Sequence, residues 1–422
     1  MHDSEDGFAS FTGRSEHDLN AQRMLKNLQF VILLASLSIV VLTAGLPIYS
    51  SEIGATGFEV GQLFAIGALT TAVARPLVGR ALDLYGRKPF LMLGILIVAL
   101  SMLLFAIARN IPLLLLASTA QGFGVGTMLL ASYTMTADLT MAKGRAGSFG
   151  STEQSQYRGG LYGGLLAIPI LFLTGFNPQG QLRITPLAWT IMFALYGLVA
   201  FVALAAAHFY VRETYIILVR HESPEEQRSE NRINKQLYVL MAIVALTSAS
   251  ASGIAPFILK FIEDHITQDV AMIALAYLPA SIVWGFLPSK MGVIADRFGR
   301  KLPMAVGLTV SGLFSAVIPF LTTIFPLTVF ATVEAVCYSA AVPAEQALVA
   351  DMTGGKQRGI GFGLYTLGMS VGRVLGPLAM GWLYDRIRSG PFIANGVILM
   401  IGTFLVLVLL RDPAKQGKTK TV

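Results

Sequence analysis

One ten-residue segment occurs twice in this chain, and its two copies stand 213 positions apart (292 minus 79). The first copy, GRALDLYGRK, spans Gly79–Lys88, and the second, GVIADRFGRK, spans Gly292–Lys301. The same offset relates further residues of the two halves: Asp138 to Asp351, Arg145 to Arg358, Gly150 to Gly363, Gly159 to Gly372 and Gly163 to Gly376. Since no gap is needed, the chain contains two copies of one unit, which indicates two similar bundles with a pathway between them.

The chain is apolar enough to use a lipid bilayer as its solvent. Hydrophobic residues make up 54% of it and charged residues 13%, whereas soluble proteins average about 25% charged residues. Apolar runs of roughly 20 residues can cross a hydrocarbon core about 30 Å thick as helices. Such runs begin near Leu28, Val60, Phe90, Pro112, Phe149, Pro186, Leu237, Val270, Pro303, Pro326, Gly361 and Phe392. These twelve runs predict an all-α membrane protein of two pseudo-symmetric six-helix bundles.

Positive charges predict the orientation in the membrane. Of the 31 Lys and Arg, most fall in the two terminal segments and in every second loop. Only five fall in the other loops: Arg109, Arg183, Lys260, Arg386 and Arg388. Because the basic side of a membrane protein is the cytoplasmic side, both termini are expected in the cytoplasm, in a multi-pass protein of the plasma or inner membrane. The formal charge of +7 then belongs to loop ends, so no nucleic-acid partner is expected.

The runs and loops divide the chain into five parts. These are a cytoplasmic tail over 1–24, an N-terminal six-helix bundle over 25–211, a cytoplasmic linker over 212–236, a C-terminal bundle over 237–411 and a second tail over 412–422. The five histidines are scattered and no phosphate-binding loop is present. We therefore expect no metal, no cofactor and no enzymatic activity, and the protein is expected to be a monomer.

The repeated loop has a physical interpretation of its own. Gly79 lacks a side chain, so another helix can approach closely there. Gly86 permits a tight turn between two spans. Asp83 stands at a helix end, where its carboxylate can accept hydrogen bonds from the free amides at the start of a neighbouring helix.

This loop resembles the signature of the major facilitator superfamily, G-x-x-x-D-x-x-G-R-K. Its first copy comprises Gly79, Asp83, Gly86, Arg87 and Lys88, and its second copy comprises Gly292, Asp296, Gly299, Arg300 and Lys301. Glu213-Thr214 at the end of span six is similar to an acidic mark of the same family. The resemblance covers nearly the whole chain and implies two bundles that transport a solute by alternating access.

The resemblance also implies a gating latch. Asp83 would then contact the start of span eleven near Gly359, and Arg87 would pair with Asp138. In the second half, Asp296 would contact the start of span five and Arg300 would pair with Asp351. Arg145 and Arg358 occupy matching positions after these acids. The alternative is that all of these residues are ordinary charges that set the orientation.

Six charged residues lie inside predicted spans, where charges are rare, costly and usually face a wet cavity. They are Arg75, Glu153, Arg158, Glu334, Glu345 and Arg373. Helix rise places Arg75, Glu153 and Glu345 in an inner layer and the other three near the midplane. Two interpretations stay open: structural ion pairs, or a glutamate that exchanges protons together with an arginine that binds an anion. Glu334 is the expected coupling acid, and Arg373 is its expected partner. Gln121 is the counterpart of Glu334 at the repeat offset, and it is expected on the same pathway.

The family's branches leave the substrate open. Ser118 stands where many proton-coupled members carry an arginine, and span five reads YRGGLYGG, without the proline usual in drug:proton antiporters. The expected function is a secondary active transporter that moves a small organic solute, with protons as the coupling ion and with export as the direction. The alternatives are uptake, flipping of a lipid-like substrate without proton exchange, and a membrane sensor that does not transport.

Overall fold

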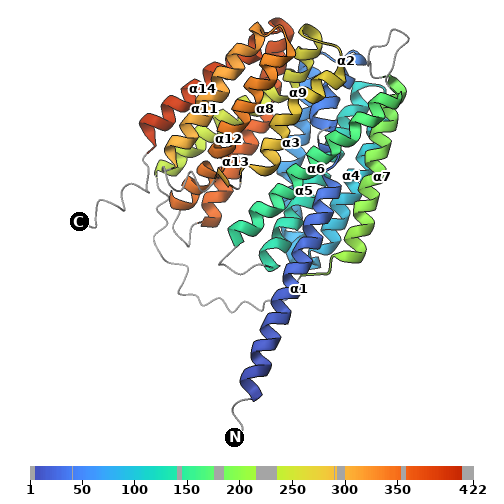
Figure 1. Ribbon diagram of the computed structural model, residues 1–422, viewed down its shortest axis with the longest axis vertical. Coiled ribbons are helices and arrows are strands. Elements are labelled where there is room, and N and C mark those ends of the chain that lie inside the picture. The colour runs from blue at the N-terminus through green and yellow to red at the C-terminus, as the bar shows by residue number, and fades with distance from the viewer. Residues whose placement is uncertain are drawn as a thin grey trace, which may run out of the picture.

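The structure is a computed structural model, and it describes residues 5–39, 41–139, 145–174, 185–214, 235–288, 290–291, 300–352 and 358–410. Throughout these ranges the secondary structure is helical, with no strand. The two halves of the chain form two groups of helices that stand side by side, and helix α1 extends beyond them at one end (Figure 1). The predicted all-α architecture is therefore confirmed.

The first half begins with a long helix that is interrupted near its middle. Helix α1 ends at Ala35, and a π-helical turn over Val41–Gly45 leads into the short helix α2, which begins with Pro47 in its first turn. The helices of this half are α1 (Glu5–Ala35), α2 (Leu46–Glu52), α3 (Gly57–Tyr85), α4 (Lys88–Ile107), α5 (Ile111–Leu139), α6 (Arg145–Thr174) and α7 (Pro186–Tyr210).

The second half repeats this order. Its described helices are α8 (Lys235–His265), α9 (Val270–Phe286), α11 (Lys301–Val317), α12 (Ile324–Met352), α13 (Arg358–Arg386) and α14 (Gly390–Leu409). A helix stands at each of the twelve predicted positions, and within the described residues eight helices are long and apolar enough to cross a membrane. Most of the predicted linker over 212–236, and the tail over 412–422, lie outside the described residues.

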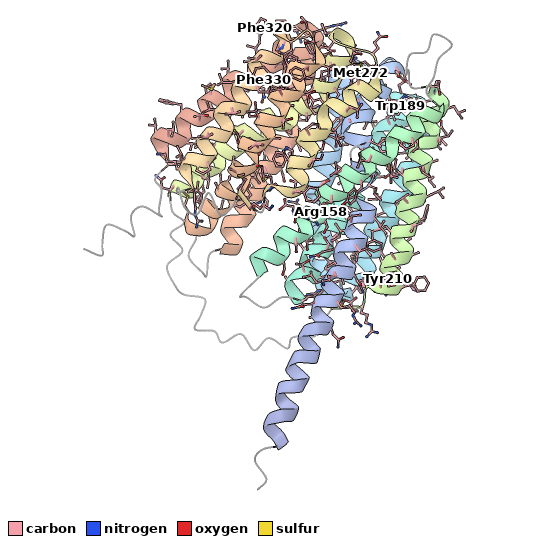
Figure 2. All side chains as sticks on the ribbon, viewed as in Figure 1. Arg158, Trp189, Tyr210, Met272, Phe320 and Phe330 are labelled. Atoms are coloured by element: carbon pink, nitrogen blue, oxygen red, sulfur yellow. The ribbon has the colours of Figure 1, made fainter. Side chains whose placement is uncertain are left out.

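The molecule has two ends that differ in the residues they carry. The basic end carries the turn Gly86–Lys88, Asp138 and Lys301, and the far end carries Thr56–Gly57 and Asp385. Figure 2 shows Tyr210 toward the basic end, and Trp189, Met272 and Phe320 at the far end. Trp189 is fully buried there and stacks on Phe193 with ring centres 5.8 Å apart. Fully burying one such aromatic side chain stabilises a fold by about 1.5–3 kcal/mol.

Glycines of the repeat lock the same helix pair together in each half. A methyl group at Gly163 of α6 would lie 1.8 Å from the carbonyl oxygen of Leu37, which lies just after the end of α1. At its counterpart, Gly376 of α13, a methyl group would lie 2.0 Å from the carbonyl oxygen of Ala249 in α8. Only a residue without a side chain permits such backbone contact, so the duplicated glycines preserve one packing arrangement in both bundles.

Replacing Gly163 by alanine tests this arrangement. Because the added methyl group overlaps a backbone carbonyl, we expect Gly163→Ala to destabilise the protein by roughly 1–3 kcal/mol, the usual cost of overpacking. Gly150→Ala on the same helix is the control, since no atom of the described residues lies within 4 Å of a methyl group there. Thermal unfolding in detergent measures both variants. Equal melting temperatures for the two would contradict the packing role of Gly163.

Candidate functional site

Charged residues from both halves meet between the two groups of helices. Arg373 of α13 interacts electrostatically with Glu153 of α6, Glu345 of α12 and Arg75 of α3. Although Arg373 lies in the middle of a long helix, its side chain is exposed. It therefore faces a space between the halves, and the structure brings together four of the six charges predicted inside the spans.

Tyrosines surround these four charges, which we call the central cluster (Arg75, Glu153, Glu345 and Arg373). The hydroxyl of Tyr365 hydrogen-bonds to the carboxylate of Glu345. Three other tyrosines interact electrostatically with cluster members, and they come from α5, α6 and α12: Tyr133, Tyr157 and Tyr338. Phenolic groups can donate and accept hydrogen bonds, so the surroundings of the cluster are polar as well as aromatic.

The central charges stand near one another without closing into ion pairs. Among the residues that the structure describes, the ion pairs join Arg87 to Asp138, and Lys260 and Arg388 to Asp264, none of which belongs to the cluster. The interpretation as structural ion pairs requires direct contact between arginine and glutamate. Separated charges of both signs, held by two bundles, instead fit a space whose groups change partners.

Glu334 has a different partner from the one expected. Its carboxylate accepts a hydrogen bond of 2.8 Å from Ser311 of α11, within its own bundle, rather than from Arg373. Its counterpart Gln121 is buried and accepts a hydrogen bond from Ser101 of α4. Both side chains thus link equivalent helices, α12 to α11 and α5 to α4. The repeat relationship was predicted, but these contacts point to the interior of each bundle.

The basic end holds the ion pair that the resemblance implied. Arg87 Nε lies 3.1 Å from Asp138 Oδ2, and Thr214 Oγ1 donates to the same carboxylate at 3.0 Å. Glu213 accepts hydrogen bonds from the backbone amides of Arg87 and Lys88, at 2.9 and 3.0 Å. A carboxylate at a helix start satisfies free amides and complements the helix dipole. Glu213 therefore caps α4, a role that the sequence did not suggest.

Three residues of the first copy of the repeated loop, Gly86, Lys88 and Gly79, have surroundings that the structure describes. Gly86 has a φ of +94°, and a methyl group on it would lie 2.7 Å from the Glu213 carboxylate. Lys88 Nζ donates to the carbonyl of His208 at the end of α7, and its repeat counterpart Lys301 donates to Leu407 at the end of α14. At Gly79 the described residues do not show the expected close helix approach, because the nearest of their atoms to a methyl group there is a Leu130 side-chain carbon at 3.9 Å.

Most of the remaining latch residues lie outside the part of the chain that the structure describes. Gly292, Asp296 and Gly299 fall outside the described residues, as do the side chains of Asp83, Arg145, Asp351 and Arg358. Arg300 is described at the start of α11. The latch between spans two and eleven at the basic end therefore stays a prediction.

A contact that the sequence analysis missed joins the two halves at the far end. The carboxylate of Asp385, at the end of α13, accepts hydrogen bonds from the amides of Gly57 and Phe58 at the start of α3, at 2.6 and 2.8 Å. Close backbone approach continues below it, since a methyl group at Gly61 would lie 2.2 Å from the Pro377 carbonyl oxygen. The signal in the sequence was the capping pattern Thr56–Glu59, which marks a helix start with free amides.

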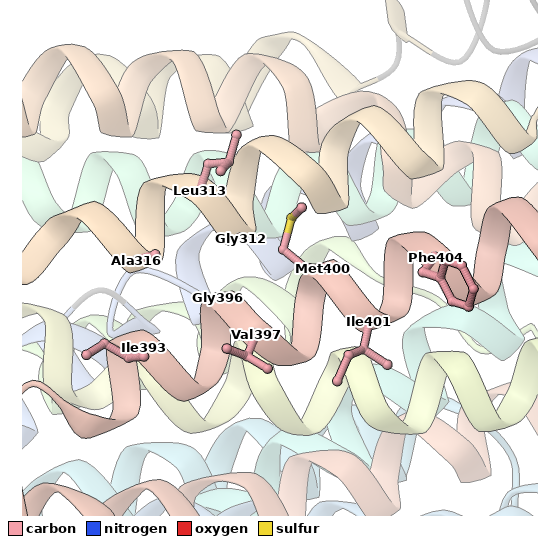
Figure 3. Close-up of a pocket in the computed structure, with 9 residues that line it drawn as sticks. All are labelled: Gly312, Leu313, Ala316, Ile393, Gly396, Val397, Met400, Ile401 and Phe404. Atoms are coloured by element: carbon pink, nitrogen blue, oxygen red, sulfur yellow. The ribbon is translucent and has the colours of Figure 1, made fainter.

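An apolar groove of about 440 Å³ lies elsewhere, between α11 and α14 (Figure 3). Its lining is aliphatic and aromatic, from Gly312 and Leu313 to Phe404, and includes no charged side chain. Gly312 and Gly396 bring the two backbones close together at its base, since a methyl group on Gly312 would lie 3.2 Å from the carbonyl oxygen of Gly396. A site without polar groups suits hydrocarbon chains and offers no chemistry for a charged solute, so the central cluster is the better candidate for solute binding.

Replacing Asp385 tests the far-end contact. In Asp385→Asn the two amides lose a charged acceptor, so we expect the far ends of α3 and α13 to separate more often, by on the order of 1–2 kcal/mol. Spin labels at Phe58→Cys and Ile387→Cys, in a Cys337→Ser background, would report a longer distance component. Asp269→Asn is the control, because Asp269 caps its own helix through Met272. An unchanged distance distribution in Asp385→Asn would contradict the closure.

Comparison with known proteins adds to this geometry. The profile described as Major Facilitator Superfamily matches residues 28–288 and 237–422. Multidrug resistance protein 2 of Bacillus subtilis (strain 168) is 23% identical over 401 residues, which cover 90% of this chain and 94% of that protein. Quinolone resistance protein NorA of Staphylococcus aureus (strain COL) is 22% identical over 394 residues, which cover 92% of this chain and 97% of NorA.

A solved structure shares the arrangement of helices. A bacterial homologue of the human lysosomal transporter Spinster, in an inward-facing and occupied conformation, matches with a TM-score of 0.76 at 15% identity. The match covers 93% of this chain and 96% of the other. With a family profile that matches both halves and a duplicated helical fold around a polar centre, the chain belongs to the major facilitator superfamily and is a multi-pass membrane transporter.

Proposed function

We propose that this protein exports small organic solutes by alternating access and that proton movement drives the export. The multidrug and quinolone resistance proteins to which the chain is similar support this direction and this substrate class. We further propose that all twelve long helices cross the membrane, with both termini in the cytoplasm and in the plasma or inner membrane. The basic end then faces the cytoplasm.

The observation that carries the proposal is the position of Arg373. It interacts with one acid of each bundle, Glu153 and Glu345, and forms an ion pair with neither among the described residues. A proton that binds one of these acids cancels its charge, and the arginine is then attracted to the other acid. Because the two acids belong to different bundles, protonation changes the attraction between the bundles, which is the coupling that a proton-driven transporter needs.

The far-end contact supports a gating scheme. With Asp385 bound to the start of α3, the described state is closed at the far end. Under the proposed orientation this is an inward-facing state, the state of the solved structure that shares the fold. We propose that the repeated loop supplies the opposite latch, with Asp83 at the start of α13 when the basic end closes. The same helix pair, α3 and α13, would then be held at one end or the other.

Glu345 is the first candidate for the coupling acid. It interacts electrostatically with Arg373 and shares a hydrogen bond with Tyr365, whose hydroxyl can pass a proton. Glu153 is the second candidate, since it faces Arg373 from the other bundle. Glu334, the acid favoured by depth alone, is bound to Ser311 inside its own bundle. The coupling role therefore passes from Glu334 to the central cluster.

Aromatic side chains favour amphipathic solutes. Tyr157 and Trp284 lie with ring centres 6.0 Å apart, and Trp284 and Tyr338 also lie 6.0 Å apart. These rings come from α6, α9 and α12, so they line the boundary between the bundles beside the central cluster. Aromatic faces bind flat apolar bodies and leave polar tips free. Uptake, lipid flipping without protons and a sensor without transport are the alternatives that the following assay also separates.

A liposome assay with a proton gradient tests the proposal. We expect the purified protein to accumulate fluoroquinolones or lipophilic amines against their gradient while interior pH changes in step. In Glu345→Gln the side chain resembles the protonated acid, so proton-driven accumulation should fall at least tenfold while downhill exchange continues. Glu334→Gln is the matched control: it keeps the hydrogen bond to Ser311 and should retain uphill transport.

The outcomes are distinct. Full uphill transport by Glu345→Gln would move the coupling role to Glu153, and full uphill transport by the Glu345→Gln, Glu153→Gln double variant would contradict proton coupling by the central cluster. Solute movement without any pH change would favour the alternatives without protons. If neither fluoroquinolones nor lipophilic amines are transported, the proposed substrate class is contradicted.

A further inference from the structure

Arg158 stands apart from the central cluster. Its Nε atom is buried and has no hydrogen-bond partner among the described residues, and no described acid forms an ion pair with it. Its guanidinium carbon lies 4.8 Å from the centre of the Phe286 ring at the end of α9. Because an unpaired cation within a membrane span is costly, the position indicates that Arg158 recognises an anion.

Arg158 lies on the seam between α6 and α9, where the two bundles meet. One turn away, Gln154 Nε2 donates to the carbonyl of Gly285 at 3.1 Å, which fixes α6 against α9. Tyr157, which directly precedes Arg158 on α6, lies beside Trp284 of α9. Figure 2 shows Arg158 near mid-height of the molecule, where the two halves meet. The seam thus presents one positive charge framed by aromatic rings from both bundles.

The second seam between the bundles, between α3 and α13, is built differently. There the backbones themselves touch, through Gly61 with Pro377 and through Gly57 with Gly381, which leaves no room for a ligand. The repeat counterpart of Arg158 on that seam is Val371. At the α6–α9 seam the contact is made by side chains, and Tyr157 and Phe286 are each 41% exposed. This seam therefore leaves more room for a ligand than the α3–α13 seam does.

We propose that the α6–α9 seam binds amphiphiles that carry an anionic group, with the anion on Arg158 and the apolar body against Tyr157, Trp284 and Phe286. A guanidinium donates parallel hydrogen bonds to two oxygens of a carboxylate, sulfonate or phosphate, and aromatic faces bind the apolar part.

An acidic organic solute and an anionic lipid share this chemistry. The inference rests on the proposed function, because Tyr157 also belongs to the surroundings of the central cluster. A ligand that leaves the seam inward therefore reaches Arg373.

The test uses 11-(dansylamino)undecanoate as an anionic amphiphile and a trimethylammonium probe with the same dansyl-alkyl body as its cationic match. Binding to purified protein in phosphatidylcholine nanodiscs is measured by dansyl emission. Arg158→Gln should weaken binding of the anion by about tenfold or more, the factor expected from losing a charge-assisted hydrogen bond, and should leave the cation unaffected. Arg158→Lys should restore most of the affinity, because it restores the charge.

Tryptophan fluorescence locates the bound probe. Energy transfer to the dansyl group should fall most in Trp284→Phe, since Trp189 lies at the far end and Trp382 near the end of α13. A Tyr157→Leu variant, which keeps the charge and removes an aromatic face, should weaken both probes and serves as a second test should Arg158→Gln fail to fold. Weaker probe binding in nanodiscs of phosphatidylglycerol assigns the site to lipid headgroups, and unchanged binding assigns it to solutes.

Unchanged affinity for the anion in Arg158→Gln, or an equal loss for both probes, would overturn the inference. These outcomes are independent of the transport assay. Arg158-dependent binding without proton-driven transport of any solute would leave the seam site in place and reject the proposed function. Proton-driven transport without Arg158-dependent binding would support the proposed function and reject the seam site.

Discussion

The cost of placing charge inside a membrane governs this structure. Isolated arginine and glutamate side chains are strongly disfavoured in hydrocarbon, yet the central cluster places two of each between the bundles. They are tolerable only where water or polar groups reach them, and the tyrosines Tyr133, Tyr157, Tyr338 and Tyr365 supply such groups. Under the proposed function, the position of these charges defines the pathway, and the rest of the fold holds their surroundings in place.

The fold divides into parts that are fixed and parts that can exchange contacts. Glycine-mediated backbone contact fixes α6 against the first span and α13 against α8, so each bundle can move as a unit. Between the bundles at the far end, the carboxylate of Asp385 accepts hydrogen bonds from two backbone amides of α3. Such a contact can be broken and remade at a small energetic cost, which suits a gate.

The sequence repeat made many contacts within each bundle predictable. Counterpart positions have counterpart contacts, as Lys88 and Lys301 show at the ends of α7 and α14, and the predicted pairing of Arg87 with Asp138 is present. Depth along a helix was also predictable, but the direction in which a side chain points was not. Glu334 therefore received the wrong partner, and Asp385 was missed, because contacts between bundles leave no periodic signal in the sequence.

The central claim is that the charges between the bundles are reached from one end at a time, and site-directed labelling tests it most directly. Ser370→Cys, one turn from Arg373 on α13, would be introduced in a Cys337→Ser background and exposed to a membrane-impermeant maleimide in proteoliposomes of known orientation. We predict rapid labelling from the basic end, little from the far end, and a gain from the far end in Asp385→Asn. Labelling that is equal from both ends, or faster from the far end, in the parent protein would contradict the account.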